Sequence, residues 1–178
     1  MRNRILTMLA GLALCLPLFA QTQGGIPLLD KVEGQRVRFH YTYSLSRQGG
    51  SFERITDGAV TVQGNCYVLE GLGLKVISDG STRWTMDPDA KELVIEKVEQ
   101  EDLFTNPALF ISSYRAYMDR ITVNSQGADA LDVTLRLDAD TRARFLLKHI
   151  VFSEPQEKSD FTLDEKSLPE GYVITDLR

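Results

Sequence analysis

Cysteine is nearly absent from this chain, and its scarcity limits how the fold can be held together. Only two of the 178 residues are cysteines, Cys15 and Cys66. Cys15 lies in the apolar N-terminal stretch described below, so cleavage of that stretch leaves Cys66 alone. No intrachain disulfide can then form, even in an oxidising compartment. We therefore expect a hydrophobic core to hold the fold.

Histidine is equally rare, and the motifs of several enzyme classes are missing. His40 and His149 are the two histidines of the chain, and no Cys/His spacing matches a zinc site. The sequence contains neither a G-x-S-x-G nucleophile elbow nor a P-loop. Cys66 has no activating base near it in the sequence, so the expected role is that of a small core residue. We predict a protein that is not an enzyme and needs no cofactor or metal.

Basic residues are in the minority. The chain has 20 Lys and Arg against 25 Asp and Glu. Without Arg2 and Arg4 the balance is 18 against 25, a net charge of −7. The basic residues are scattered and form no patch interleaved with aromatic residues, which argues against a nucleic-acid partner.

A long apolar run occurs only at the N-terminus. Met1–Arg4 carries two arginines, the fifteen residues Ile5–Phe19 are almost wholly apolar, and Ala20 precedes a polar stretch. A positive start, a short apolar region and a small residue before polar ones are typical of a secretory signal peptide. We predict a signal peptide at 1–20, cleaved near Ala20, followed by a single domain at 21–178.

Alternating apolar and polar residues predict a mainly β chain. Val37 to Leu45 alternates with period two, which indicates a strand with one apolar face. Further strand-like runs lie between turn residues at 52–55, 59–62, 66–69, 76–78, 92–98, 120–123, 131–138, 160–163 and 172–174. Asp79-Gly80 predicts a type I′ turn, in which both central residues have positive φ. Ala143–Phe152 is apolar on both sides and predicts a strand covered on both faces.

One short helix is predicted within the β pattern. Asn106 can cap its start, and Pro107 suits the first helical position because its missing N–H has no partner there. Phe110, Tyr114 and Tyr117 then fall on one helical stripe, with Leu109 beside it. We therefore predict a mainly β (α+β) fold, with a single antiparallel sheet and a short apolar helix.

The apolar side chains of sheet and helix allow two interpretations. If the sheet curls and the helix lies across its concave face, the two enclose a hydrophobic binding cavity. Otherwise the same residues fill a solid core. The candidate cavity and lid residues are Phe39, Tyr41, Tyr43, Val60, Val62, Leu69, Trp84, Met86, Leu109, Phe110, Tyr114 and Tyr117.

The segment 76–93 resembles a known family. Its Ser78-Asp79-Gly80, Trp84 and Pro88 match the S-D-G-x-x-x-W-x-x-x-P segment of the LolA-like outer-membrane lipoprotein carriers, in their divergent Bacteroidetes form. Supporting pieces occur in the expected order along the mature chain: Leu28–Val32, Val37–Tyr43, Gly64–Tyr67, Asn106-Pro107 and Leu168–Ile174.

This resemblance implies an incomplete β-barrel with a short helical lid, acting as a monomeric periplasmic carrier. The implied cargo is the acyl chains of lipoproteins, or other lipid, moving from an inner-membrane ABC transporter to an outer-membrane acceptor. Each buried methylene contributes about 0.8 kcal/mol, so such a carrier needs apolar surface and no catalytic groups. Better-known members have a lid-pinning arginine where this chain has Gln63. The alternative is a non-catalytic envelope adaptor or structural domain with a filled core.

Overall fold

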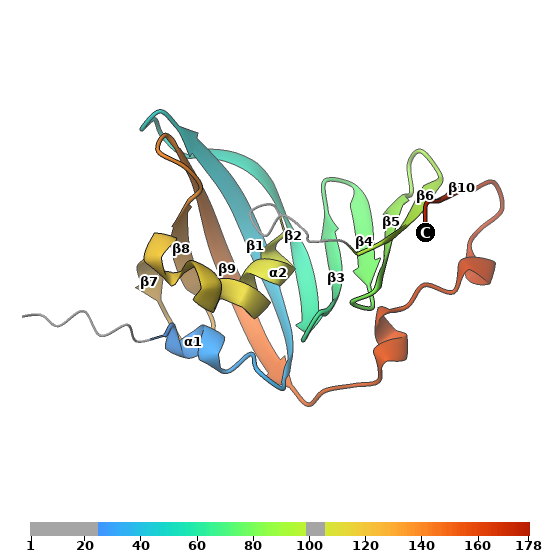
Figure 1. Cartoon of the computed structure of the whole chain (residues 1–178), viewed down its shortest axis with the longest axis horizontal. Coiled ribbons are helices and arrows are strands. Elements are labelled where there is room, and N and C mark those ends of the chain that lie inside the picture. The colour runs from blue at the N-terminus through green and yellow to red at the C-terminus, as the bar shows by residue number, and fades with distance from the viewer. Residues whose placement is uncertain (1–24, 99–105) are drawn as a thin grey trace, which may run out of the picture.

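The strands that the sequence predicts join into one sheet (Figure 1). The computed structural model describes residues 25–98 and 106–178, so the predicted signal peptide lies outside it. The strands are β1 (Arg36–Arg47), β2 (Glu53–Gln63), β3 (Cys66–Gly71), β4 (Leu74–Ser78), β5 (Thr82–Asp87), β6 (Glu92–Lys97), β7 (Ile121–Gln126), β8 (Leu131–Arg136), β9 (Thr141–Ser153) and β10 (Val173–Asp176). Their spatial order is β10-β6-β5-β4-β3-β2-β1-β9-β8-β7.

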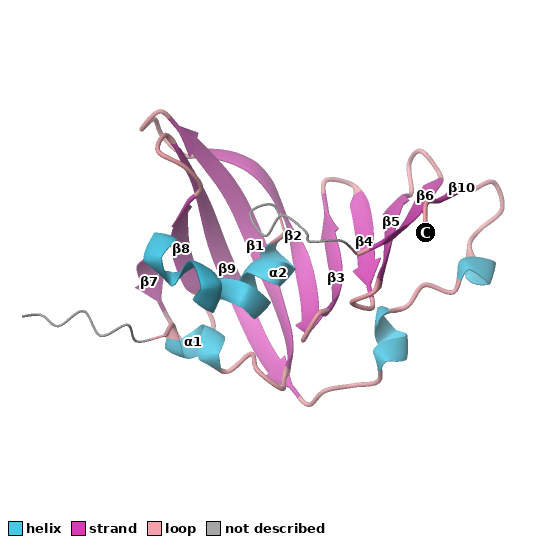
Figure 2. Cartoon of the chain, in the orientation of Figure 1, coloured by secondary structure: helices cyan, strands magenta, loops and turns pink. Residues whose placement is uncertain are grey.

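The helices are short and lie outside the sheet (Figure 2). The α-helices are α1 (Pro27–Asp30) and α2 (Pro107–Ser113), and the 3₁₀ segments are η1 (Tyr114–Arg120), η2 (Lys158–Phe161) and η3 (Glu165–Ser167). The predicted mainly β class and the single sheet are confirmed.

The prediction of an all-antiparallel sheet is wrong at one edge. β10 pairs with β6 in parallel, with Val173 opposite Glu92 and Asp176 opposite Ile95. Parallel neighbours need a long crossover connection, and residues 154–172 provide it. We call this segment the C-terminal crossover. Figure 1 shows it, orange to red, leaving the lower end of β9 and reaching β10 beside β6. The ten-stranded sheet is therefore mixed, and it is not closed into a barrel.

The strand register separates two faces of the sheet, because cross-strand partners point to the same side. One row of partners runs Phe39, Val60, Leu69, Val76, Thr85, Val94. Its buried members pack with α1, α2 and η1, so we call this side the helix face. The opposite row runs Arg38, Thr61, Val68, Ile77, Trp84, Ile95. Its apolar end packs with Leu163, Leu168 and Tyr172 of the crossover, so we call this side the crossover face.

Strand β9 is covered on one face only, contrary to the expectation from its apolar composition. Ala143, Phe145 and Leu147 are buried on the helix face, whereas Lys148 and His149 are both exposed. The alternation breaks because β9 carries a bulge opposite β1, where the register shifts between Arg38 and His40. A bulge places two residues against one and turns a side chain to the other face.

The turn before β5 also differs from the prediction. Gly80 has a φ of +89°, but Asp79 is not in the positive-φ region, so the turn is not type I′. The Asp79 carboxylate instead accepts hydrogen bonds from the backbone N–H groups of Ser81 and Thr82, both at 2.7 Å. Aspartate stabilises turns in this way by bonding to backbone groups just ahead of it.

Two glycines let the ring of Tyr41 lie against neighbouring strands on the helix face. A Cβ atom at Gly58 would lie 1.8 Å from the Glu70 carbonyl oxygen and 2.9 Å from the Tyr41 ring. At Gly71 it would lie 2.4 Å from the Tyr41 hydroxyl. The aromatic ring thus fills the space that the glycines leave open.

We predict that Gly58→Ala lowers the free energy of unfolding by about 1–3 kcal/mol or more, because the backbone must move to admit the methyl group. Gly127→Ala is the control, since its Cβ would meet nothing closer than 3.8 Å, and it should stay within about 0.5 kcal/mol of the wild type. Urea unfolding of both variants measures the difference. Equal effects would contradict the close packing of Tyr41.

Candidate functional site

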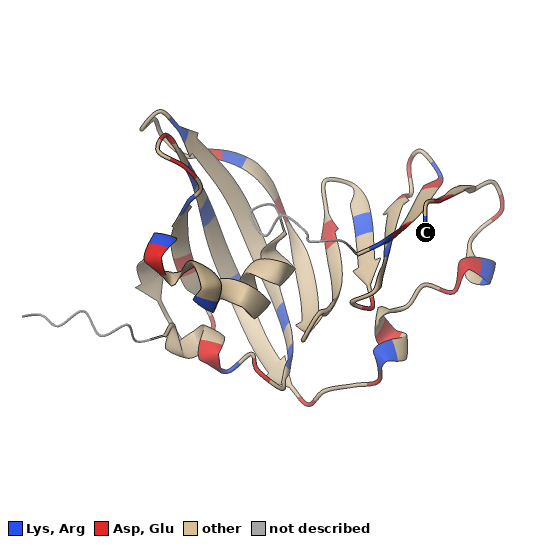
Figure 3. Cartoon of the chain, viewed as in Figure 1, with Lys and Arg blue, Asp and Glu red and all other residues tan. Residues whose placement is uncertain are grey.

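Helix α2 begins as the sequence predicts. The Asn106 carboxamide oxygen accepts hydrogen bonds from the backbone N–H groups of Ala108, at 2.9 Å, and Leu109, at 3.4 Å. Pro107 occupies the first helical position. The α-helix ends at Ser113 and continues as the 3₁₀ segment η1. Pro107–Ser113 contains no charged residue, so Figure 3 shows this helix without red or blue.

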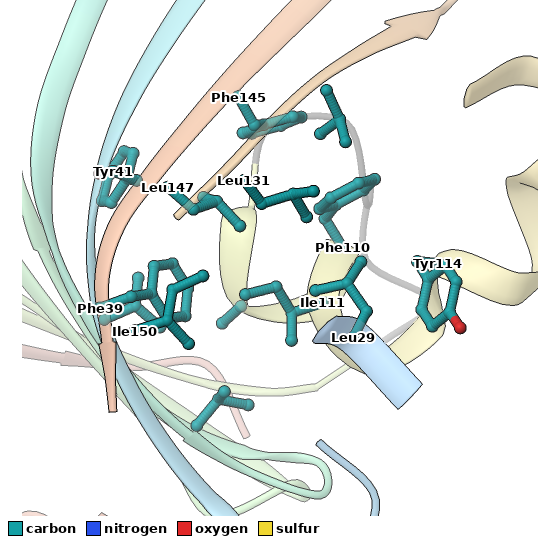
Figure 4. Close-up of a cluster of buried hydrophobic side chains, with 14 of the residues drawn as sticks. Leu29, Phe39, Tyr41, Phe110, Ile111, Tyr114, Leu131, Phe145, Leu147 and Ile150 are labelled. Carbon is teal, nitrogen blue, oxygen red and sulfur yellow. The ribbon is translucent and has the colours of Figure 1, made fainter. Parts of the chain in front are cut away.

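An aromatic stack fixes α2 on the helix face. The rings of Phe110 and Phe145 are nearly parallel, 12° apart, with their centroids separated by 4.9 Å. Phe145 in turn contacts Tyr43 of β1 with a centroid distance of 5.1 Å. Aromatic pairs at these separations add about 0.5–1.5 kcal/mol beyond the area that they bury. Figure 4 shows Phe110 and Ile111 directed from the helix toward Phe145, Leu147 and Leu131.

The centre of this cluster is filled. Phe39 and Phe145 are 0% exposed, and Val60, Phe110 and Ile111 are each 1% exposed. Side chains this inaccessible have almost no contact with solvent. The arrangement in the structure therefore corresponds to the filled core that the sequence left as one of two interpretations.

The rim of the cluster is less covered than its centre. Leu69 and Val76, on the strands beyond β2, are only half-buried. Leu109 and Tyr117, on the two helical segments, are also half-buried. In the row of cross-strand partners on the helix face, the burial of the side chains therefore decreases from Phe39 in β1 toward Val76 in β4.

A polar cluster joins α1 to η1; we call it the latch. The Tyr114 hydroxyl donates a hydrogen bond to the Asp30 carboxylate, and the Arg115 guanidinium binds the same oxygen at 2.7 Å. A Cβ at Gly25 would lie 2.6 Å from the Asp30 carboxylate and 2.8 Å from the Tyr114 hydroxyl. A side chain at this position would require the ends of Asp30 and Tyr114 to shift.

The latch shifts the ionisation of its members. The hydrogen bonds from Tyr114 and then Arg115 hold the pKa of Asp30 below its ordinary value of 3.8. Burial first, and the hydrogen bond to Asp30 second, raise the pKa of Tyr114. The latch therefore favours a charged Asp30 and a neutral Tyr114.

The resembled family has a lid-pinning arginine at the position of Gln63. In this structure the Gln63 side chain instead binds the C-terminal crossover. Its side-chain amide donates to the Gln156 carbonyl at 2.8 Å and accepts from the Gln156 N–H at 2.9 Å. Arg54 pairs with Asp57 on the surface, and Arg38 is exposed on the crossover face. Among the described residues, the latch is the polar link between α1 and η1.

The structure brings together ten of the twelve candidate site residues. Phe39, Tyr41, Tyr43, Val60, Val62, Leu69, Leu109, Phe110, Tyr114 and Tyr117 belong to one apolar cluster on the helix face. Trp84 and Met86 do not join them; both lie in the second cluster, on the crossover face. The Trp84 indole N–H donates to Glu165 of η3 at 3.3 Å. Trp84 pairs with Ile77, the residue next to Val76. Successive residues of a strand point to opposite faces, so Trp84 and Val76 lie on different sides of the sheet.

Sequence analysis missed several members of the cluster. Phe145 and Leu147 of β9 are fully buried against α2, and Leu29 of α1 and Ile111 of α2 close the lower side. Alternation through Ala143, Phe145 and Leu147 could have revealed the two β9 residues. No sequence pattern relates Leu29 to α2, because that contact depends on tertiary structure.

A groove of about 290 Å³ opens between α1, α2 and the β2–β3 turn. Apolar Leu29, Val32 and Ile111 line it together with polar Asp30, Asn65 and Arg115. Such mixed walls suit water better than an acyl chain. The groove is lined by residues of both helices and of the latch.

The described residues contain no group of three or more His, Cys, Asp or Glu that could hold a metal ion. Cys66 is buried as predicted, with its Sγ 3.1 Å from the Asp79 carbonyl oxygen. In residues 25–98 and 106–178, no helix is long and apolar enough to cross a membrane.

We predict that Asp30→Asn destabilises the contact between α1 and η1 at neutral pH, and that the difference from the wild type disappears in acid. Because the folded-state pKa is below 3.8, the contribution is complete above that value and is lost as the pH falls through the folded pKa. Melting temperatures of both proteins, measured from neutral pH downward, test this. The exposed pair Arg54–Asp57 provides a control in Asp57→Asn, which should change little at neutral pH. A constant difference between wild type and Asp30→Asn at all pH values would contradict the role of the Asp30 charge.

The comparisons with known proteins identify no family. No family model matches the chain, and no curated protein matches it. Among solved structures, one similar chain is an uncharacterized conserved protein from Thermus thermophilus. It is 9% identical, with a TM-score of 0.44, over 84% of this chain and 95% of that one.

Proposed function

We propose that this chain is a periplasmic carrier that binds acyl chains of lipoproteins, or a related lipid, on the helix face of its sheet. In this proposal the sheet forms a curled, incomplete barrel, and α2 with η1 forms a lid. Cargo enters when the lid moves away. The resemblance of residues 76–93 to the LolA-like carriers suggests this class, with an inner-membrane ABC transporter and an outer-membrane acceptor as partners.

The observation that carries the proposal is the independence of α2 from the sheet. No strand of the described sheet depends on α2 for its ladder hydrogen bonds. The helix is held by the packing of Phe110 and Ile111 and, through η1, by the latch. It can therefore leave without breaking a strand pair, and what it uncovers is apolar.

The energies of closing the lid and of binding an acyl chain are comparable. Uncovering three or four large apolar side chains costs about 6–8 kcal/mol at roughly 2 kcal/mol each. Burying about ten methylenes of an acyl chain returns about 8 kcal/mol. A lid with this balance closes on the apolar face when cargo is absent and opens when cargo replaces its contacts.

The half-buried rim provides the point at which cargo would start to bind. Leu69 and Val76 of the helix face are incompletely covered even with α2 in place. An acyl chain could bind there and extend toward Phe39 as α2 withdraws. The proposed carrier residues are accordingly the ten on the helix face, without Trp84 and Met86.

The filled centre of the cluster favours a second candidate, a non-catalytic envelope adaptor or structural domain. Exposed fractions of 0–1% for Phe39, Phe110 and Phe145 are what a permanent core requires. This candidate predicts that α2 never leaves and that no lipid binds.

Two neighbouring residues of β3 allow a matched test. Leu69 lies on the helix face and Val68 on the crossover face, and both are half-buried apolar residues. We predict that Leu69→Gln weakens binding of a fluorescent acylated peptide by about tenfold or more, since one polar group in an apolar site costs about 1–3 kcal/mol. Val68→Gln should bind as the wild type does.

Titrations are accompanied by circular dichroism and melting curves, which establish that both variants fold. Native mass spectrometry of the wild type checks that the peptide binds one to one. Equal weakening in both variants would contradict a site on the helix face. No uptake by the folded wild type would reject the carrier and leave the adaptor.

A further inference from the structure

The two histidines of the chain meet on the crossover face of the sheet, although 108 residues separate them in the sequence. His40 is in β1 and His149 is in β9. Their imidazole rings are 5.7 Å apart between centroids and nearly perpendicular, at 83°. Both residues are exposed, so their ring nitrogens are accessible from solvent.

The β9 bulge is what places His149 beside His40. Lys148 is the direct partner of His40, and regular pairing would put His149 opposite Phe39, which points into the core. Instead His149 adopts a left-handed φ of +54°, and Ile150 takes the buried position. A non-glycine residue in this region is strained, and such residues cluster at functional sites.

We propose that His40 and His149 form a two-ligand binding site for a borderline transition-metal ion such as Cu²⁺, Ni²⁺ or Zn²⁺. The ring spacing fits this role. A metal about 2.0–2.1 Å from each imidazole nitrogen lies about 3.2 Å from each ring centre, so a tetrahedral angle places the centres about 5.2 Å apart. The observed centres are 5.7 Å apart, and a small rotation of these two exposed side chains closes that difference. Imidazole nitrogen is a preferred ligand of these ions, and Mg²⁺ or Ca²⁺ would not bind.

The number of protein ligands and the neighbouring charge determine how tightly the site binds a metal ion and which ion it prefers. Two protein ligands leave the other coordination positions to water, so binding is weaker than at a four-ligand structural zinc site. Lys148 is a close positive neighbour, and its charge opposes that of the ion. Affinity should follow the general order for nitrogen ligands, with Cu²⁺ bound more tightly than Ni²⁺ or Zn²⁺.

A bound ion would act on the sheet where its hydrogen-bond ladder is interrupted. The register shift lies between Arg38 and His40, and the two histidines join the strands on either side of it. The ion would therefore stabilise the folded protein increasingly as its concentration rises. This site lies on the opposite side of the sheet from the proposed cargo, and it does not depend on the carrier function.

The test is isothermal titration of the untagged mature protein with NiCl₂ and CuSO₄, together with melting curves with and without the metal. We expect one ion per chain, a higher melting temperature with metal, and affinity lowered about tenfold or more by His40→Ala and by His149→Ala. Because both histidines are exposed, both variants should melt as the wild type does without metal.

Lys148→Gln provides a control that keeps both ligands and removes the opposing charge, so it should bind nickel at least as tightly as the wild type. Wild-type affinity in either single histidine variant would overturn the proposal. So would a melting temperature that metal raises equally in the wild type and in the variant lacking both histidines.

Discussion

The packing of one uncharged helix, α2, buries the apolar centre of the helix face of the sheet. Phe110 stacks on Phe145 at 4.9 Å, and Ile111 closes the cluster between α1 and β9. Without that cover, the apolar side chains of β1, β2 and β9 would face water, a liability for any exposed sheet. The latch orients the helix, but dispersion and apolar burial supply most of the attraction.

The two faces of the sheet are covered in different ways. On the crossover face, residues 154–172 are attached by directional bonds, among them Gln63 to Gln156 and Trp84 to Glu165. Arg36 adds a 2.6 Å ion pair to Asp160. The helix face carries the larger apolar cluster, and the latch joins α1 to η1 there. The less directional cover is the one that an apolar ligand could replace.

Local patterns predicted the elements well, and long-range geometry accounts for what they missed. Period-two alternation in Val37–Leu45 and the cap at Asn106-Pro107 led to a strand and a helix that the structure confirms. The sequence analysis placed Trp84 at the same site as Phe39, but the two residues lie on opposite faces of the sheet. Three strands separate them, and a difference of one residue in the register is enough to change the face. The bulge at His149 and the parallel β10 depend on tertiary contacts, so neither could be anticipated from periodicity. That the ten candidate residues of the helix face bind cargo remains a prediction.

In the proposed carrier, cargo and helix α2 compete for the same apolar face. Amide hydrogen exchange, followed by mass spectrometry with and without an acylated peptide, tests it most directly. The account predicts faster exchange in 108–120 when the peptide binds, because the lid has moved away, and slower exchange in β1 and β9, which the acyl chain now covers. Peptide binding with unchanged exchange in 108–120 would contradict the competition and place any cargo elsewhere on the molecule.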